Sequence, residues 1–275
     1  MNRIIFGESV QGASHIRADK ECQDSYKKVD FGKDIAIISV ADGHGSNSCP
    51  YSKTGSEIAV NVFCKVMTDF CCHYEDNMNA LMTYLNREGD TKVAQVIDTE
   101  WKKRVYIQHR NNKREIVLDK QGKIDKGAIY KQYGSTLLGV MITRTFLFAF
   151  QLGDGDIMYV DVDGVKSVIE GDKILGTETH SLSKQDSWKS AITVVLNKDE
   201  GEKVPYMYML SSDGMSNSFT SQDEFYKTCR DYYDLIKAHG CKTIARYIKE
   251  WLSETSALGC GDDITVMIGY YEEAL

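Results

Sequence analysis

Aspartate residues stand at the ends of four separate apolar segments of the chain, each beside a glycine. They are Asp42 in VADGHG, Asp154 in QLGDGD, Asp213 in SSDGMS and Asp262 in GCGDDITV. Asp-Gly is a common turn after a strand, so each could be a turn residue and nothing more. Carboxylates gathered at the ends of packed strands would repel one another unless a cation held them. Because Mg²⁺ and Mn²⁺ prefer hard oxygen ligands, the pattern indicates an acidic metal site as the alternative to four unrelated turns.

His44 lies two positions after Asp42 and adds an imidazole to this group. Imidazole titrates near neutral pH, so His44 could transfer a proton in catalysis; the alternative is a surface turn residue. Asp161 and Asp163 superficially match the start of a calcium loop, but Gly164 follows at the fourth position rather than the sixth. The chain has no GxSxG, CxxC or GxxxxGK[ST] motif, which argues against a serine nucleophile, a zinc cluster and a P-loop.

The bulk composition is that of an ordinary globular protein. The chain has 275 residues, 42% of them hydrophobic, and only two prolines, which favours one catalytic domain over residues 1–275. A net charge of −7 and a pI near 5.4 argue against a nucleic-acid partner. No apolar run approaches the roughly 18 residues of a membrane span, and the N-terminus does not resemble a signal peptide. We therefore expect a cytoplasmic protein with no membrane partner, whose eight cysteines are mostly buried free thiols.

Apolar segments bounded by turn residues predict the strands. They occupy residues 35–43, 135–164, 190–197, 206–214 and 263–271. Several are apolar on successive residues, so we expect both faces of these strands to be covered. Residues 146–153 and 157–162 are predicted to form a hairpin around Gly153–Asp156, with a second tight turn at Asp163-Gly164.

Apolar residues at three- and four-residue steps predict helices between these strands. The pattern covers Ser52–Phe70, residues 93–101 and residues 244–252. Ser221, with Glu224 three positions later, fits a capping box at the start of a further helix. These apolar stripes are interpreted as core faces without chemistry of their own.

A polar, charge-mixed connection between His109 and Tyr133 separates two of these blocks. It predicts either a short hairpin around Gln121-Gly122 or a mobile loop. Because strands and helices alternate in blocks rather than in a strict β-α repeat, the sequence favours antiparallel sheets flanked by helices.

Six motifs in order then resemble a known family. They are ECQDSY at 21–26, VADGHG at 40–45, YGSTLLGV at 133–140, LGDGDIMYV at 152–160, LSSDGMSN at 210–217 and GDDITVMI at 261–268. This series is similar to the metal-dependent type 2C protein Ser/Thr phosphatases. It is closest to bacterial members that open with Ser-His and Cys-Gln-Asp, here Ser14-His15 and Cys22-Gln23-Asp24. The resemblance spans about residues 12–270.

The resemblance implies an α+β fold, a four-layer α/β/β/α sandwich of two antiparallel sheets flanked by helices. It also implies two Mn²⁺ or Mg²⁺ ions at one edge. By similarity, Asp42 would bridge both metals and the carbonyl of Gly43 would bind one of them. Asp213 and Asp262 would complete the shell of the other metal, and Asp24 would act largely through coordinated water. His44 is then the plausible general acid for the leaving oxygen.

Other positions follow from the same resemblance. Asp154 matches the position of a third, weaker metal that is shared with Asp213. Asp19 stands where many members have a phosphate-binding Arg, which leaves Arg17 or His15 as substitutes; a solvated surface charge is the alternative for Arg17.

Two departures concern the metal ligands. Gln23 replaces a frequent Glu, and Asp263 stands where Asn is common, so the ligand is either Asp262 or Asp263. Residues 171–190 occupy the place of a substrate flap, in which an accessible Trp188 could contact a phosphopeptide or belong to an ordinary loop.

The sequence therefore predicts hydrolysis of phosphoserine or phosphothreonine in a phosphorylated protein substrate, which a cognate Ser/Thr kinase would supply. Two alternatives stay open: a non-catalytic phosphoprotein-binding or scaffold relative, and a hydrolase of small phosphate esters.

Overall fold

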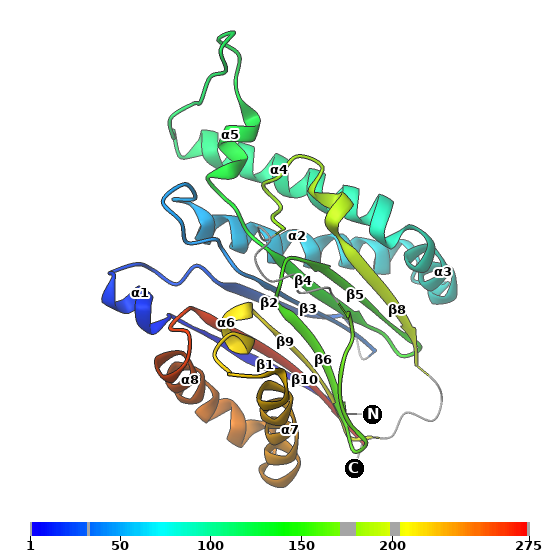
Figure 1. Cartoon of the computed structure of the whole chain (residues 1–275). Helices are drawn as coiled ribbons and strands as arrows, with labels where there is room; N and C mark the ends of the chain where they lie inside the picture. Colours follow the sequence, from blue (N-terminus) through cyan, green and yellow to red (C-terminus); the bar gives the residue numbers. More distant parts are fainter. Residues whose placement is uncertain (1, 32–33, 171–179, 199–203, 274–275) are drawn as a thin grey trace.

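The computed structural model describes residues 2–31, 34–170, 180–198 and 204–273 and contains two five-stranded antiparallel sheets (Figure 1). The first has the order β1-β10-β9-β6-β7, formed by Asn2–Val10, Ile264–Glu272, Tyr206–Ser211, Asp156–Asp161 and Gly164–Ser167. The second has the order β2-β3-β4-β5-β8, formed by Ser25–Phe31, Ile35–Ala41, Leu137–Ile142, Phe146–Leu152 and Ile192–Asn197.

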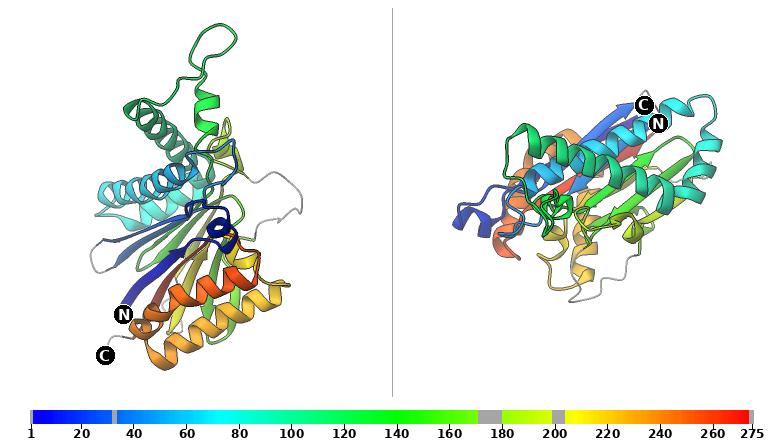
Figure 2. Two further views of the ribbon diagram at one scale, coloured as in Figure 1. Left: turned by 90° about the vertical axis from the view of Figure 1, so that its left-hand side faces the viewer. Right: turned by 90° about the horizontal axis from the view of Figure 1, so that it is seen from above.

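Helices cover the outer face of each sheet (Figure 2). One side carries α2 (Ser52–His73), α3 (Met78–Glu88), a π-helical turn at Gly89–Val93 and α4 (Ala94–Asn111), and α2 packs on β2, β3 and β4. The other side carries α7 (Gln222–His239) and α8 (Cys241–Leu258). Shorter helices are α1 (Ala13–Arg17), α5 (Lys126–Lys131), a 3₁₀ turn at Ser187–Ser190 and α6 (Asp213–Ser216). The predicted α/β/β/α arrangement is confirmed.

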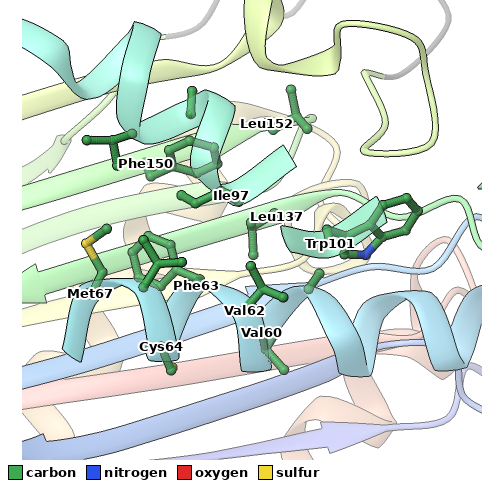
Figure 3. Packing of buried hydrophobic residues seen from close by; sticks show 14 of the residues in the cluster. Val60, Val62, Phe63, Cys64, Met67, Ile97, Trp101, Leu137, Phe150 and Leu152 are labelled. Carbon is green, nitrogen blue, oxygen red and sulfur yellow. The ribbon is translucent and has the colours of Figure 1, made fainter. Parts of the chain in front are cut away.

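Strand alternation explains why successive apolar residues are all buried. In β3, Ile37 belongs to the core under the helices, whereas its neighbour Ile38 belongs to the core between the two sheets. Phe63 of α2 and Phe150 of β5 meet in the outer core, with ring centroids 6.0 Å apart (Figure 3). The central strands β3, β4, β5, β9 and β10 thus bury both faces, and the rigid four-layer stack fixes where these strands end.

The expected hairpin between residues 146–153 and 157–162 is wrong. β5 pairs with β4 and β8, whereas β6 pairs with β7 and β9 in the other sheet. The chain crosses between the sheets at Gly153, whose φ of 113° is open to glycine. Both strands are apolar on both faces, so each could pair within a different sheet. The turn at Asp163-Gly164 is confirmed, because Asp161 pairs with Gly164.

The predicted helices are present, and their ends follow local hydrogen bonds. Ser221 Oγ accepts a hydrogen bond from Glu224 N at 3.3 Å and caps α7. The reciprocal half of the expected capping box is shifted, because the Glu224 carboxylate accepts from Thr220 N rather than from Ser221 N. The 109–133 connection contains a hairpin, with a bridge between Leu118 and Ile124.

None of the helices in the described part of the chain combines the length and the apolar character that a membrane span requires. All eight cysteines are free thiols; five are buried, as expected, while Cys72 and Cys260 are exposed.

Candidate metal centre

Strand pairing brings Asp24 and Asp42 together at one edge of the stack. Ser25 at the start of β2 is paired with Ala41 at the end of β3, so the residues just outside this pair are neighbours. Asp42 is held by two hydrogen bonds to Thr136: its N–H donates to Thr136 Oγ1 at 2.9 Å, and its carbonyl accepts from Thr136 N at 2.8 Å. The backbone of Asp42 is therefore fixed next to β4.

The other sheet contributes Asp154, Asp213 and Asp262 to the same edge. Ser211 at the end of β9 is paired with Asp156 of β6 and with Val266 of β10. The chain therefore leaves β9 into α6, which begins at Asp213, beside the turn before β6 and the turn before β10. Burial raises the pKa of Asp213, and the charges of Asp154 and then Asp262 raise it further, so the three carboxylates are close neighbours.

Ser212 joins the two sheets at this edge. Its Oγ donates to Asp24 Oδ2 at 2.6 Å and accepts from Thr265 N at 2.9 Å. Its own N–H donates to the Thr265 carbonyl at 3.0 Å. One side chain thus holds the Asp24 carboxylate of one sheet against the adjoining ends of β9 and β10 in the other.

The clustered carboxylates are held at high electrostatic cost. Burial raises the pKa of Asp42 well above its usual range, and the nearby charges of Asp24, Asp213 and Asp262 raise it further. Burial likewise raises the pKa of Asp24 to about 7, and burial with the charge of Asp154 raises that of Asp213 to about 6. The interaction between the Asp42 and Asp213 carboxyl groups adds to the rise in the pKa of Asp42 and opposes the rise in that of Asp213. Such an arrangement favours protons or a cation between them.

One oxygen of this cluster is left without a partner. Asp24 is 6% exposed, and its Oδ1 is buried without a hydrogen bond to any residue in the described ranges. A buried carboxylate oxygen with no donor is costly unless something cationic or aqueous contacts it. Asp24 therefore presents an unused ligand atom toward the same edge.

The loop that follows Asp42 is closely packed at two glycines: Gly43 lies within the loop, and Gly134 lies on the segment that faces it. A Cβ on Gly43 would lie 2.8 Å from the carbonyl oxygens of Gln23 and Ser52. A Cβ on Gly134 would lie 2.5 Å from Cδ2 of His44, whose N–H donates to the Gly134 carbonyl at 3.1 Å. The absence of a side chain at Gly134 thus leaves room for the half-buried His44 ring.

Asp262 and Asp263 have different surroundings. The Asp263 carboxylate accepts hydrogen bonds from Gly12 N at 2.6 Å and from Gln23 N at 2.7 Å, so both of its oxygens are used. The Asp262 side chain is 49% exposed and borders the cluster. This difference favours Asp262 as the ligand and gives Asp263 a structural part.

His15 lies between these two aspartates. Its Nε2 is 3.5 Å from Asp262 Oδ1, and its Nδ1 is 2.9 Å from Asp263 Oδ1 without the geometry of a hydrogen bond. Over the ranges that the structure describes, these three residues form the one group of three whose ligand atoms lie within 4.8 Å of one another. Because Asp263 already binds two backbone N–H groups, we interpret the group as a brace between α1 and the start of β10.

Arg17 is exposed at the end of α1 and forms no ion pair with any residue that the structure describes. Trp188 is partly buried and packs on the core under α2 and α4, which favours the ordinary-loop alternative over a phosphopeptide contact. Residues 171–179 of the expected flap lie outside the described residues.

Sequence reasoning missed three residues that hold the aspartates. They are Thr136, Ser212 and Asn217, whose Nδ2 donates to Asp213 Oδ2 at 2.9 Å. Each lies within a motif quoted above, and Asn217 follows Asp213 by one helical turn, a spacing that could have indicated the contact.

These features, two antiparallel sheets between helices with aspartates at one edge, define the fold of the metal-dependent Ser/Thr phosphatases. The sequence profile described as "Protein phosphatase 2C" matches residues 11–254. The chain therefore belongs to the protein phosphatase 2C family. A comparison with curated protein sequences finds no match.

Solved structures are similar to the chain over its whole length at low identity. A bacterial serine phosphatase has a TM-score of 0.60 at 11% identity, with all of both chains covered. The catalytic domain of the Ser/Thr phosphatase PstP, in complex with two manganese ions, has a TM-score of 0.56 at 12% identity, covering 98% of this chain and 99% of that chain. PppA, a regulatory component of T6SS in Pseudomonas aeruginosa, has a TM-score of 0.57 at 13% identity, covering 98% and 99%. At these identities the likeness establishes the fold.

Proposed function

We propose that this protein is a Mn²⁺- or Mg²⁺-dependent phosphatase that hydrolyses phosphoserine and phosphothreonine in proteins. The observation that carries the proposal is the cluster of Asp24, Asp42 and Asp213, in which burial and the charges of nearby aspartates raise the pKa of each carboxyl group. Membership of the protein phosphatase 2C family supports the same activity.

The residues present fit a pair of divalent cations. Oxygen donors suit Mn²⁺ and Mg²⁺, and the unpartnered Asp24 Oδ1 offers a ligand atom that nothing else in the described structure uses. The residues that would hold the ions are Asp24, Asp42, the Gly43 carbonyl, Asp213 and Asp262, with Asp154 for a third ion. When bound, such ions supply Lewis-acid chemistry, in that they lower the pKa of water and neutralise charge on phosphoryl oxygens.

The chain's own residues position these groups and handle the proton. Thr136 fixes the backbone of Asp42, whereas Ser212 and Asn217 hold the carboxylates of Asp24 and Asp213, so these two side chains need little rearrangement. His44, held against Gly134, is proposed to donate a proton to the departing Ser or Thr oxygen. Arg17 lies two residues beyond His15 at the same edge, and we assign it to the substrate phosphate; His15, braced by Asp262 and Asp263, is the weaker candidate.

Hydrolysis of p-nitrophenyl phosphate and of a phosphothreonine peptide tests the proposal. We expect turnover only with Mn²⁺ or Mg²⁺ and a loss of about three orders of magnitude in kcat for Asp42→Asn. Asp223→Asn, an exposed carboxylate in the first turn of α7, is the matched control and should keep full activity. Undiminished activity in chelator, or near-full activity of Asp42→Asn, would overturn the assignment.

The same measurements separate the alternatives. A phosphoprotein-binding relative without catalysis would retain a phosphopeptide equally well after Asp42→Asn and show no turnover with metal. A hydrolase of small esters would cleave p-nitrophenyl phosphate but leave the peptide intact. The proposed function further implies a Ser/Thr kinase that produces the substrate, which co-purification with phosphorylated partners can identify.

A further inference from the structure

A narrow arm, residues 112–125, projects from the body of the molecule between α4 and α5 (Figures 1 and 2). Its two limbs are joined by hydrogen bonds from Asp119 N to the Lys123 carbonyl at 2.7 Å and from Asp125 N to the Val117 carbonyl at 2.9 Å. Gly122, with a φ of 75°, forms the tip. The arm is therefore an ordered hairpin.

An aromatic cluster anchors the base of the arm. The Arg114 guanidinium lies 3.4 Å from the centre of the Tyr51 ring and also donates to the Tyr133 hydroxyl. The fully buried His109 contacts that hydroxyl through Nδ1 at 3.2 Å and the Glu115 carbonyl through Nε2 at 2.9 Å. Cation–π and hydrogen-bond contacts of this kind fix the direction in which the arm leaves the body.

The same base is tied to the loop that begins at the metal centre. Tyr51 N donates to the Gln132 carbonyl at 2.9 Å, and Cys49 Sγ donates to the Lys131 carbonyl at 3.1 Å. The loop that carries Asp42 and His44 thus ends on the arm's base. In Figure 1 the arm rises on the same side as α1, which brings His15 to the cluster.

The arm exposes apolar side chains together with positive charge. Ile116, Leu118 and Ile124 are 37%, 57% and 42% exposed. Leu118 and Ile124 are bridge partners, and Ile116 is two residues from Leu118, so the three share one face. Because the hairpin projects from the body, these apolar side chains do not cover a hydrophobic core, and their exposure indicates a contact surface.

Two of the three acidic side chains of the arm accept hydrogen bonds within it, the third, Glu115, is exposed, and the lysines have no such contacts. Asp119 Oδ1 accepts from the N–H groups of Gln121 and Lys123, and Asp125 Oδ1 caps α5. Lys113, Lys120 and Lys123 are exposed, and none forms an ion pair with a residue in the parts of the chain that the structure describes. Residues 112–125 contain four cationic and three acidic side chains, so the arm is an apolar projection with a net charge of about +1 on a chain with a net charge of −7.

We propose that this arm docks the protein substrate by binding an acidic segment that contains apolar residues, separate from the phosphorylated residue. The inference rests on the proposed phosphatase function. A chain of net negative charge repels acidic phosphoproteins, and the exposed lysines of the arm supply local attraction. The apolar row adds contact area that free phosphate or a small ester cannot use. A protein is favoured over a membrane because the arm is fixed to the catalytic loop rather than hinged.

Binding in chelator tests the arm without requiring turnover. Phosphorylated casein, an acidic phosphoprotein, is immobilised and probed by biolayer interferometry with metal-free wild type, Lys120→Glu/Lys123→Glu and Leu118→Asn. We expect each variant to weaken binding about tenfold and salt to weaken the wild type further. The controls are Lys242→Glu/Lys249→Glu on α8, which changes charge equally, and Leu258→Asn, whose side chain is 90% exposed.

Kinetics with metal then separate the two proposals. Arm variants should raise KM for phosphocasein about tenfold and leave kcat/KM for p-nitrophenyl phosphate unchanged. Equal casein binding by wild type and arm variants, or arm-dependent binding to phosphatidylcholine–phosphatidylglycerol vesicles but not to casein, would overturn the docking proposal. Arm-dependent binding without any hydrolysis would instead refute the phosphatase and preserve the docking.

Discussion

Asp262 and Asp263 are adjacent and chemically identical, but their surroundings give the two side chains different exposure and different hydrogen-bond partners. The Asp263 side chain is 3% exposed and binds the backbone of two distant segments at Gly12 and Gln23, whereas that of Asp262 is 49% exposed and faces the other carboxylates. Sequence alone left the ligand open between them, because both follow Gly261 and precede the strand. Only the tertiary partners, some 240 and 251 residues away, distinguish the two.

We expect Asp263→Ala to destabilise the protein by about 2–4 kcal/mol, because two buried N–H groups lose a charged acceptor. Asp262→Ala should change the free energy of unfolding by less than about 1 kcal/mol, since its side chain is half exposed. Urea unfolding of the metal-free proteins measures both changes. Metal-dependent hydrolysis should nevertheless fall further in Asp262→Ala than its stability explains. If Asp262→Ala lost more stability than Asp263→Ala, and Asp263→Ala lost more hydrolysis than its stability explains, the ligand would instead be Asp263.

At the scale of elements, helices were easier to predict than strand partners. The three- and four-residue apolar spacing of α2 and the Ser221 cap of α7 are local signals that the chain carries whatever its partners. The pairing of β5 and β6 is not local. Gly153–Asp156 reads as a hairpin turn, but Leu152 pairs with Leu137 in one sheet and Asp156 with Ser211 in the other. Short sequence spacing could not reveal this crossing.

The cap at Ser221 predicts a measurable contribution from a single hydroxyl. Ser221→Ala removes the acceptor for Glu224 N and should lower the free energy of unfolding by about 1 kcal/mol. Urea unfolding with metal present measures the change. Ser253→Ala is the control, because its exposed hydroxyl only contacts the Lys249 carbonyl one turn earlier in α8. A loss for Ser253→Ala as large as that for Ser221→Ala would refute a specific capping role.

At the scale of the whole molecule, packing of the two sheets and repulsion between the carboxylates at their shared edge act in opposite directions. Core packing fixes the strand ends, and Ser212 ties Asp24 of one sheet to β9 and β10 of the other. The same fixed edge holds Asp24, Asp42 and Asp213 together although their charges repel. The motifs could single out these aspartates as candidate ligands. They could not predict the raised pKa values, which depend on burial in the assembled stack.

The raised pKa values predict that the metal-free protein loses stability as pH rises. The folded pKa values of about 7 for Asp24 and about 6 for Asp213 lie above the usual Asp value of 3.8 in an unfolded chain. The folded state therefore favours the protonated carboxyls. Their stabilising contribution is complete below the unfolded pKa and is lost as pH passes through the folded values. With folded pKa values of about 7 and about 6, the loss between about pH 5 and pH 8 should be on the order of 4 kcal/mol.

Urea unfolding in chelator across that range measures this slope, and the same series with Mn²⁺ provides the contrast. A cation that binds the ionised carboxylates stabilises the folded state more at higher pH, so Mn²⁺ should flatten or reverse the slope. Asp42→Asn removes one charge from the cluster and should make the metal-free slope shallower, whereas Asp223→Asn on the surface of α7 should leave it unchanged. A metal-free protein that becomes more stable from about pH 5 to pH 8 would show that these carboxylates do not repel one another in solution.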